Sequence, residues 1–445
     1  MDIVIAGAGD VGFHLAELLT IENQNITLID VSEKALQYAE NHLDVLVIQG
    51  DVSSLNILKK AKVDDAHLFI AVTTQETTNL LAAILAKRLG ARKTIARVSS
   101  VEYLEDTQNF FEMGIDNLIS PHILAAQEIE RLVYRSSATD IFEFEEGQLS
   151  IVGFTADNHS KLTGKFFGEL DAETPHFSMK TLCILRNGKT IIPQEKMLVE
   201  RGDHIYLITN AQDFNKLNEY IGKRIRPIKK IIIIGGTPLA QYSAQILENN
   251  FAVTLIIEDE ERCKEMLGIL DNVLVINGEP GNIELLKEEG LEQTDAFLAL
   301  TENSETNIIT SLTAKQSGVY KTIAAVDNSA YTHISQNIGI DTLINKKIIA
   351  ANNIFRYVRK GKIEAIASMH GVNAEIIEFE IHKNNRVTQL PIRELHLPPK
   401  TAKVAGVIRN EAGIFPDEDF QLQVGDKIVV FALPKAVKKV ENIFR

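Results

Sequence analysis

The sequence lacks the features that mark several protein classes. Of 445 residues only Cys183 and Cys263 are cysteines, and neither has a partner at the spacing of a disulfide framework or zinc site. That usage is typical of a reducing compartment. The net charge of −14 argues against nucleic-acid binding, which depends on clustered basic side chains. No apolar run approaches the roughly 20 residues of a membrane span, and no signal peptide opens the chain, so we expect a cytoplasmic protein.

Catalytic signatures are missing as well. The sequence contains no GxSxG or HExxH motif and no complete P-loop GxxxxGK[ST]. Its eleven histidines are scattered singly, and each is more readily explained as a surface or packing residue than as a catalyst. We therefore predict no catalytic residue and no metal ligand, and we do not expect an enzyme.

What the sequence does contain is a long internal repeat. A shift of 228 positions (235 − 7) superposes Gly7 on Gly235, Asp30 on Glu258, Gly50-Asp51 on Gly278-Glu279, Thr73 on Thr301, and Asn79 on Asn307. Further on, GIDNLI and GIDTLI match at a shift of 225 (339 − 114), which places a short deletion in the second copy. Segments 198–209 and 422–432 also correspond. The repeat therefore duplicates a whole unit and is not a solenoid.

Each copy begins with alternating apolar strands and amphipathic helices. The strands predicted in the first copy cover residues 2–7, 26–30, 44–50, 67–73, 93–98 and 116–120. Helices between them, including one near 102–112, indicate a doubly wound parallel sheet. Gly90 could end the helix at 78–89, and Ser32 could cap an earlier one. A further helix is expected at 123–134.

From about residue 140 the pattern changes to short extended runs separated by turn signals. Asn187-Gly188 between apolar runs strongly indicates a β-hairpin. The predicted fold is an α/β tandem duplication, in which a Rossmann-like doubly wound parallel sheet domain is followed by a small β-rich α+β domain. The expected domains are 1–122, 140–223, 228–347 and 366–445.

The first copy carries a complete GxGxxG motif, GAGDVG at 7–12, between a strand and a helix. Gly7 permits a sharp turn, Gly9 lets a pyrophosphate approach the backbone, and Gly12 allows close packing of helix on sheet. Unpaired N–H groups at the helix start then face the phosphates. Asp30 ends the second strand 18 residues after Gly12 (30 − 12), where an acidic residue accepts ribose hydroxyls and disfavours NADP.

Four further residues are candidates at this site, each with a plainer alternative. Thr73 and Thr74 end the fourth strand, at the edge where ligands of open α/β sheets bind, but could simply cap the next helix. Asp51 could meet adenine or ribose, and it is equally suited to a turn. Arg97 could pair with phosphate, or it could extend from the strand end to solvent. The predicted nucleotide-binding set is Gly7, Ala8, Gly9, Asp10, Val11, Gly12, Asp30, Asp51, Thr73, Thr74 and Arg97.

The second copy starts the same motif and does not complete it. Thr237 places a β-branched side chain where pyrophosphate would approach, and Pro238 removes an N–H donor. Ala325 stands at the position equivalent to Arg97. The corresponding set is Gly235, Gly236, Thr237, Glu258 and Thr301. We expect this second site to be weakened, altered in its ligand, or empty.

Together, the motif series IVIAGAGDVG, LID, QGD, AVTTQETTN and IARV, its repetition, and the β-rich domain after each copy resemble the TrkA family. This resemblance covers nearly the whole chain. Its members are peripheral regulatory subunits of bacterial Trk potassium uptake systems, and each half resembles an RCK/KTN nucleotide-binding domain with its C-terminal partner domain. The resemblance implies NAD(H) binding at the glycine loop, with ATP or ADP possible at the same site.

The resemblance also implies the partners. It predicts a homo-oligomeric ring, a tetramer of two-unit chains, docked at the inner face of the plasma membrane on a TrkH- or TrkG-like potassium-translocating subunit. The ring would gate that subunit through a ligand-dependent conformational change. Two alternatives stay open: an NAD-dependent oxidoreductase, and a soluble nucleotide sensor acting on a partner outside the membrane. The first would need a proton-transfer residue and an anion clamp near the nicotinamide, and no plausible set follows residue 140.

Overall fold

The computed structural model of the chain divides into two compact units. One comprises Met1–Gln127 and Asn345–Val358, and the other comprises Glu128–Ile344 and Arg359–Arg445. The structure describes all residues except 22, 23, 145, 146, 157–159, 173–176, 223–225, 328–338, 360–364, 369–371, 373 and 445. Within the described residues, no helix has both the length and the apolar character that a membrane crossing requires.

The first unit is built on a six-stranded parallel sheet in the order β3-β2-β1-β4-β5-β6. Its strands are β1 (Asp2–Ala6), β2 (Asn25–Asp30), β3 (Leu46–Gln49), β4 (Leu68–Ala71), β5 (Lys93–Arg97) and β6 (Asn117–Ile119). Its helices are α1 (Asp10–Ile21), α2 (Glu33–His42), α3 (Leu55–Lys60), η1 (Val63–Asp65), α4 (Glu76–Leu89), α5 (Val101–Glu105), α6 (Thr107–Glu112) and the start of α7 (Pro121–Tyr134). The central strands are almost wholly buried, as expected for a parallel sheet covered on both faces. The doubly wound prediction is confirmed.

The predicted helix ends in this unit are confirmed at two positions, but one predicted helix is divided in two. Ser32 caps α2, accepting a hydrogen bond from the Ala35 N–H, and Gly90 ends α4 at a φ of 128°. The single helix predicted near 102–112 is wrong, because two helices meet at Asp106. The Asp106 carboxylate accepts hydrogen bonds from the Asn109 amide at 2.8 Å.

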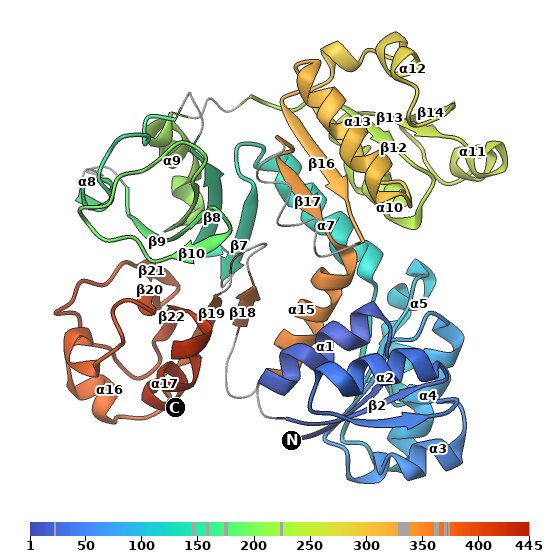
Figure 1. Cartoon of the computed structure of the whole chain (residues 1–445), viewed down its shortest axis with the longest axis horizontal. Coiled ribbons are helices and arrows are strands. Elements are labelled where there is room, and N and C mark those ends of the chain that lie inside the picture. Colours follow the sequence, from blue (N-terminus) through green and yellow to red (C-terminus); the bar gives the residue numbers. More distant parts are fainter. Residues whose placement is uncertain are drawn as a thin grey trace. The chain divides into compact units, whose positions relative to one another are not determined.

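A helix from the second half of the chain also belongs to the first unit. This helix is α15 (Lys346–Arg359), which follows the second parallel sheet in sequence and lies beside α1 (Figure 1). Asn345 caps it, accepting hydrogen bonds from the N–H groups of Lys347 and Ile348. The first parallel sheet domain is thus completed by residues more than 200 positions away.

The second unit repeats the parallel sheet in the order β14-β13-β12-β15-β16-β17. Its strands are β12 (Lys230–Ile234), β13 (Ala252–Ile257), β14 (Val273–Asn277), β15 (Ala296–Ala299), β16 (Lys321–Ala325) and β17 (Thr342–Ile344). Its helices are α10 (Pro238–Leu247), α11 (Glu260–Leu267), α12 (Ile283–Glu288), η4 (Leu291–Gln293) and α13 (Ser304–Gln316). The strand order matches that of the first sheet position by position, so the duplication read from the sequence is confirmed.

Two antiparallel sheets complete the second unit, in the orders β10-β9-β11-β8-β7 and β18-β19-β22-β20-β21. The strands are β7 (Asp140–Phe144), β8 (Leu149–Thr155), β9 (Met179–Arg186), β10 (Lys189–Ile191), β11 (His204–Thr209), β18 (Ala365–Ser368), β19 (Glu375–Glu380), β20 (Ala402–Arg409), β21 (Ala412–Ile414) and β22 (Lys427–Ala432). Their helices are α8 (Phe167–Ala172), η3 (Ala211–Asp213), α9 (Phe214–Ile221), α16 (Arg386–Gln389), η5 (Ile392–Leu395) and α17 (Pro434–Phe444). Asn187 and Gly188, both at positive φ, form the predicted hairpin turn between β9 and β10.

The two antiparallel sheets pack on a common hydrophobic core, and each sheet contains an arginine–aspartate ion pair of its own. Leu149 and Tyr206 of the first sheet pack in the same buried cluster as Phe431 of the second. In the first sheet Arg186 donates two hydrogen bonds to the buried Asp203 carboxylate, both 2.6 Å long. In the second, the same bidentate arrangement joins Arg409 to Asp426 at 2.7 and 2.8 Å. The repeat therefore extends to atomic detail.

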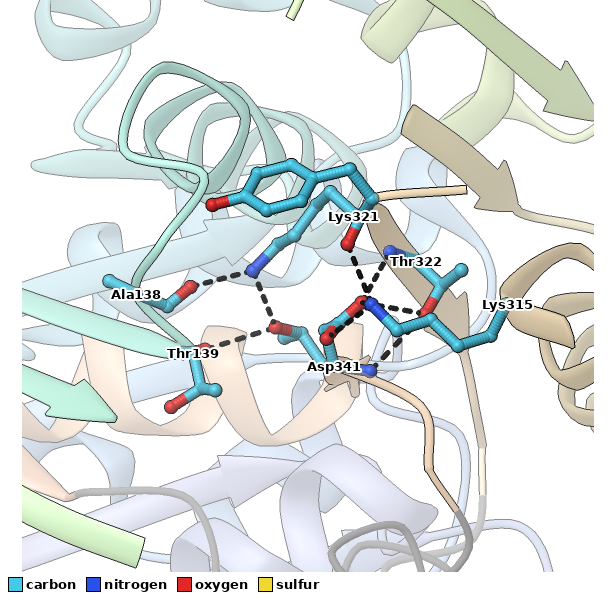
Figure 2. A network of polar contacts seen from close by, with 8 residues as sticks. Ala138, Thr139, Lys315, Lys321, Thr322 and Asp341 are labelled. Carbon is cyan, nitrogen blue, oxygen red and sulfur yellow. Dashed lines mark hydrogen bonds and ion pairs between the residues drawn. The ribbon is translucent and has the colours of Figure 1, made fainter. Parts of the chain in front are cut away.

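A polar network fixes the last strands of the second parallel sheet (Figure 2). The Asp341 carboxylate accepts hydrogen bonds from Lys315 Nζ at 2.6 Å and from the Thr322 N–H at 2.8 Å. Beside it, the ammonium of the buried Lys321 donates to the Ala138 carbonyl at 2.6 Å, which attaches the segment before β7 to this sheet. The first copy has an equivalent ion pair between Lys87 and Asp116.

This network generates a stability prediction. We expect Asp341→Ala to lower the free energy of unfolding of the second unit by about 2 kcal/mol, because Thr322 is fully buried and its N–H would lose its acceptor. The measurement is urea denaturation followed by circular dichroism. Asp271→Ala, at an exposed loop position, serves as the control and should leave the midpoint unchanged. Equal midpoints for the two variants would contradict a structural role for the network.

Candidate functional site

The turn between β1 and α1 is tightly constrained by two of its glycines. Gly7 has a φ of 111°, and its N–H donates to the Ile29 carbonyl at 2.7 Å. A Cβ on Gly7 would lie 2.9 Å from the Thr73 nitrogen, and a Cβ on Gly12 would lie 1.9 Å from the Gly7 carbonyl oxygen. Because no side chain fits at either position, the geometry of this turn requires both glycines.

Gly9 differs from its two neighbours in the motif. A Cβ at Gly9 would meet no protein atom within 4 Å, so the fold does not require glycine there. Gly9 immediately precedes α1 and has no side chain to cap it. The first N–H groups of α1 therefore have no intrahelical acceptor, and they carry the partial positive charge of a helix start. The open backbone at Gly9 and these N–H groups together suit an anion.

The Asp30 carboxylate is attached to the same turn. Its Oδ2 accepts a hydrogen bond from the Ala8 N–H at 2.7 Å, and its Oδ1 accepts one from the Ser32 N–H at 2.8 Å. Ala8 and Val11 are themselves buried. Each carboxylate oxygen has a second lone pair, so Asp30 can still accept hydrogen bonds from a ligand's hydroxyl groups.

Thr73 forms part of a local network and does not cap α4. The residue at the cap position of α4 is Gln75, which makes no side-chain capping bond. Thr73 instead donates through Oγ1 to Asn79 Oδ1 at 2.7 Å, and its N–H donates to the same oxygen at 2.9 Å. Asn79, which is buried, also donates to the Arg97 carbonyl at 2.9 Å. The helix-cap alternative is therefore wrong for Thr73, while Thr74 is exposed beside it.

Arg97 ends β5 in an unusual state for an arginine. Its side chain is half-buried, and among the described residues its guanidinium makes no hydrogen bond or ion pair. Burial without a compensating anion lowers the pKa of Arg97 from its ordinary value. A desolvated, unpaired cation at the carboxyl edge of a parallel sheet is better suited to an anionic ligand than to simple exposure to solvent.

Asp51, by contrast, behaves as a turn residue. Its carboxylate accepts hydrogen bonds from the N–H and the hydroxyl of Ser53, at 2.8 and 2.7 Å. These two bonds lower the pKa of the exposed Asp51 carboxyl, with the backbone N–H as the larger cause. The remaining predicted residues lie at the carboxyl ends of the adjacent strands β2, β1, β4 and β5. In the described part of the chain, no cluster of His, Cys, Asp and Glu is placed to hold a metal ion.

The equivalent turn of the second copy is closed by its own side chains. Gly235 keeps a φ of 116°, but Thr237 is buried and donates to the Leu300 carbonyl at 2.7 Å. The Thr237 hydroxyl also accepts from the Ala240 N–H at 3.2 Å, which uses an amide that a phosphate would need. Arg262, on α11, donates through Nε to the Gly236 carbonyl at 2.9 Å.

The strand-end residues of the second copy behave differently from one another. Thr301 and Asn307 reproduce the Thr73–Asn79 network, with the same 2.7 Å bond, and Asn307 donates to the Ala325 carbonyl. Glu258 is exposed and, in contrast to Asp30, does not bond to the turn among the described residues. The network thus persists where the features predicted to bind phosphate are absent, which indicates that it serves the fold.

Two residues near these turns were missed by the sequence reasoning, namely Arg262 and Lys347. Lys347 of α15 forms an ion pair with Asp10, the first residue of α1, with 2.6 Å between Nζ and Oδ2. Both contacts are tertiary, and the repeat offers no signal for them. At the offsets of 228 and 225, the counterparts of Arg262 and Lys347 are Lys34 and His122.

The different demands on the glycines can be tested on protein without ligand. We expect Gly12→Ala to destabilise the first unit by about 2 kcal/mol or more, because its Cβ would overlap the Gly7 carbonyl. Gly9→Ala should change the free energy of unfolding by less than about 0.5 kcal/mol. Thermal denaturation of the two variants measures this difference. A Gly12→Ala protein as stable as Gly9→Ala would refute the described turn.

Comparison with known proteins agrees with this architecture. The family model of the TrkA-N domain matches residues 3–121 and 231–346, and that of the TrkA-C domain matches residues 376–445. The chain is 31% identical to the Trk system potassium uptake protein TrkA homolog 1 of Methanosarcina mazei, over 100% of both chains. It is 33% identical to the Trk system potassium uptake protein TrkA of Haemophilus influenzae, over 100% of this chain and 99% of that protein.

Solved structures agree on the fold. The RCK domain of GsuK superposes with a TM-score of 0.62 at 16% identity, covering 100% of this chain and 94% of that one. The GsuK channel bound to NAD gives a TM-score of 0.61 at 15% identity, covering 100% and 78%. With both parallel sheets matching the TrkA-N domain, and with full-length similarity to potassium uptake proteins, the chain belongs to the TrkA family.

Proposed function

We propose that this chain is a nucleotide-binding regulatory subunit that gates a potassium-translocating membrane protein. The observation that carries the proposal is the first glycine turn, where the backbone at Gly9 is open and the start of α1 is uncapped. Membership of the TrkA family supports the role in potassium transport, and the glycine turn supports the position of the ligand site. No catalytic step is needed, because binding alone can shift a conformational equilibrium.

The residues of the first site suit a nucleoside diphosphate or a dinucleotide. The N–H groups at the start of α1 would hold the phosphates, and Asp30 would accept from ribose hydroxyls. Arg97 would pair with a phosphate oxygen, which would compensate for the desolvation of its guanidinium. The GsuK neighbours bound to NAD and to ADP support NAD(H), ADP or ATP as candidates. In this proposal Thr73 and Asp51 shape the edges of the site, and Thr74 is exposed to ligand or solvent.

The second site is proposed to bind no nucleotide. Thr237 already occupies the Ala240 N–H, Pro238 has none, and Arg262 covers the Gly236 carbonyl. Ala325 offers no cation in place of Arg97. The proposed stoichiometry is therefore one nucleotide per chain.

The energy required for gating is within reach of such a site. Moving a two-state gate from 1:99 to 99:1 takes about 5.5 kcal/mol of differential binding. If four chains form the proposed ring, each site would contribute about 1.4 kcal/mol, or a tenfold preference for one state. Ordinary phosphate contacts provide this much.

The assignment of the site predicts unequal effects of the same substitution in the two copies. Gly9→Val should weaken binding of NADH and ADP at least tenfold, because its side chain would occupy the space of the phosphates. Thr237→Val should leave the affinity unchanged, although it removes a helix cap. Isothermal titration calorimetry on the full chain measures both. Unchanged affinity in Gly9→Val would refute the site.

The proposed role of Arg97 predicts that its substitution has opposite effects on nucleotide affinity and on the stability of the ligand-free chain. Arg97→Met should weaken ADP binding about tenfold or more through loss of a charge-assisted hydrogen bond. In the absence of ligand, the same variant should be as stable as the original chain or more stable, since it removes a desolvated and unpaired charge. Calorimetric titration and thermal denaturation give the two values. A destabilised variant with normal affinity would show that Arg97 is structural.

The gating role itself is tested by ion flux. Proteoliposomes that hold the Trk-type membrane transporter of the same organism should show Rb⁺ flux that depends on this chain and changes with ADP, ATP or NADH. Gly9→Val protein should bind the vesicles and lose the nucleotide response. Flux unaffected by the chain would favour a sensor acting on a partner outside the membrane, and turnover of NADH with a carbonyl substrate would favour an oxidoreductase.

A further inference from the structure

The ion pair between Lys347 and Asp10 lies directly at the proposed phosphate site. Asp10 is the first residue of α1 and follows Gly9, so its carboxylate stands where the helix start would meet a ligand's phosphates. The helix dipole stabilises a carboxylate at this position, but the carboxylate would repel a phosphate. Lys347 Nζ, 2.6 Å from Asp10 Oδ2, supplies the opposite charge.

Of the two partners, the lysine is the better anchored. The Lys347 side chain is 24% exposed, whereas that of Asp10 is 72% exposed. Lys347 is the second residue of α15, and its N–H donates to the side chain of the buried Asn345. The backbone that carries the ammonium is therefore held in place, while the Asp10 carboxylate is free to turn toward solvent.

The second copy provides an internal comparison. The counterpart of Asp10 at the offset of 228 is Pro238, and the counterpart of Lys347 at the offset of 225 is His122. Proline carries no charge, so an equivalent ion pair cannot form. The copy with the complete glycine motif has the ion pair, and the copy with the incomplete motif lacks it. Helix packing alone gives no reason for this association.

We propose that Lys347 is a nucleotide-binding residue of the first site, supplied by the second half of the chain. This inference rests on the proposed function. When a nucleoside diphosphate or dinucleotide binds, the Lys347 ammonium exchanges the Asp10 carboxylate for a phosphate oxygen, and Asp10 turns to solvent. Nucleotide binding at the first site would thereby change a contact made by α15, the helix that precedes the second antiparallel sheet in sequence.

A double-mutant cycle separates direct contact from mere neutralisation of Asp10. The unmodified full chain, the two single variants Lys347→Gln and Asp10→Asn, and the double variant are each titrated with ADP. Lys347→Gln should weaken binding about tenfold, as loss of a charge-assisted hydrogen bond requires. Asp10→Asn should tighten binding, since it removes both repulsion and competition for the ammonium. In the Asp10→Asn background, where the ammonium has no ion pair to give up, Lys347→Gln should weaken binding by a larger factor than in the unmodified chain.

The controls make each result decisive. Lys60→Gln removes the same charge from an exposed position at the end of α3 and should leave the affinity unchanged. If Lys347→Gln has no effect in the Asp10→Asn background, Lys347 only neutralises Asp10 and the inference is overturned. If the unmodified chain binds neither ADP nor NADH, the proposed function fails instead. Thermal denaturation of each variant confirms that the loss of affinity is not a loss of folding.

Discussion

The approach of Gly12 to the carbonyl oxygen of Gly7 determines how the first half of the chain is arranged. With no room for a Cβ between them, α1 must leave β1 at once, and its first turn must stand at the carboxyl edge of the sheet. That placement brings the helix start next to Asp30 on β2 and to the strand ends of β4 and β5. In the second copy Ala240 stands at the position of Gly12, and only the constraint on the first glycine recurs, since a Cβ on Gly235 would lie 2.7 Å from the Leu300 carbonyl oxygen. A tight turn of this kind is a requirement of the fold before it is a binding site.

Comparison of the two copies separates what the fold needs from what a ligand would need. The first glycine, the Thr–Asn network and the Lys–Asp ion pair occur in both copies with nearly the same distances. Gly9 and Arg97 occur only in the first, replaced by Thr237 and Ala325 in the second. The retained features satisfy buried polar groups, whose loss would destabilise either sheet. Gly9 and Arg97 have no such structural role, which is why we connect them to a ligand.

The sequence predicted most of the fold, because its signals are local and are repeated. Alternating strands and helices, the Asn187-Gly188 turn and the offset of 228 all follow from short-range patterns. The break between α5 and α6 at Asp106 was not predicted, and the helix cap given as the alternative role of Thr73 is one that α4 does not use. Arg262 and Lys347 could not be found at all, since each reaches its partner across the tertiary structure. The domain limits at 1–122, 140–223, 228–347 and 366–445 and the set of binding residues stay predictions.

We propose that one intact glycine turn, and not two, gives each chain its ability to respond to a nucleotide. Equilibrium dialysis of the full chain against radiolabelled ADP, at concentrations well above the dissociation constant, tests it most directly by counting bound molecules. We expect one ADP per chain at saturation. Two equivalent sites, or none for ADP and none for NADH, would contradict it.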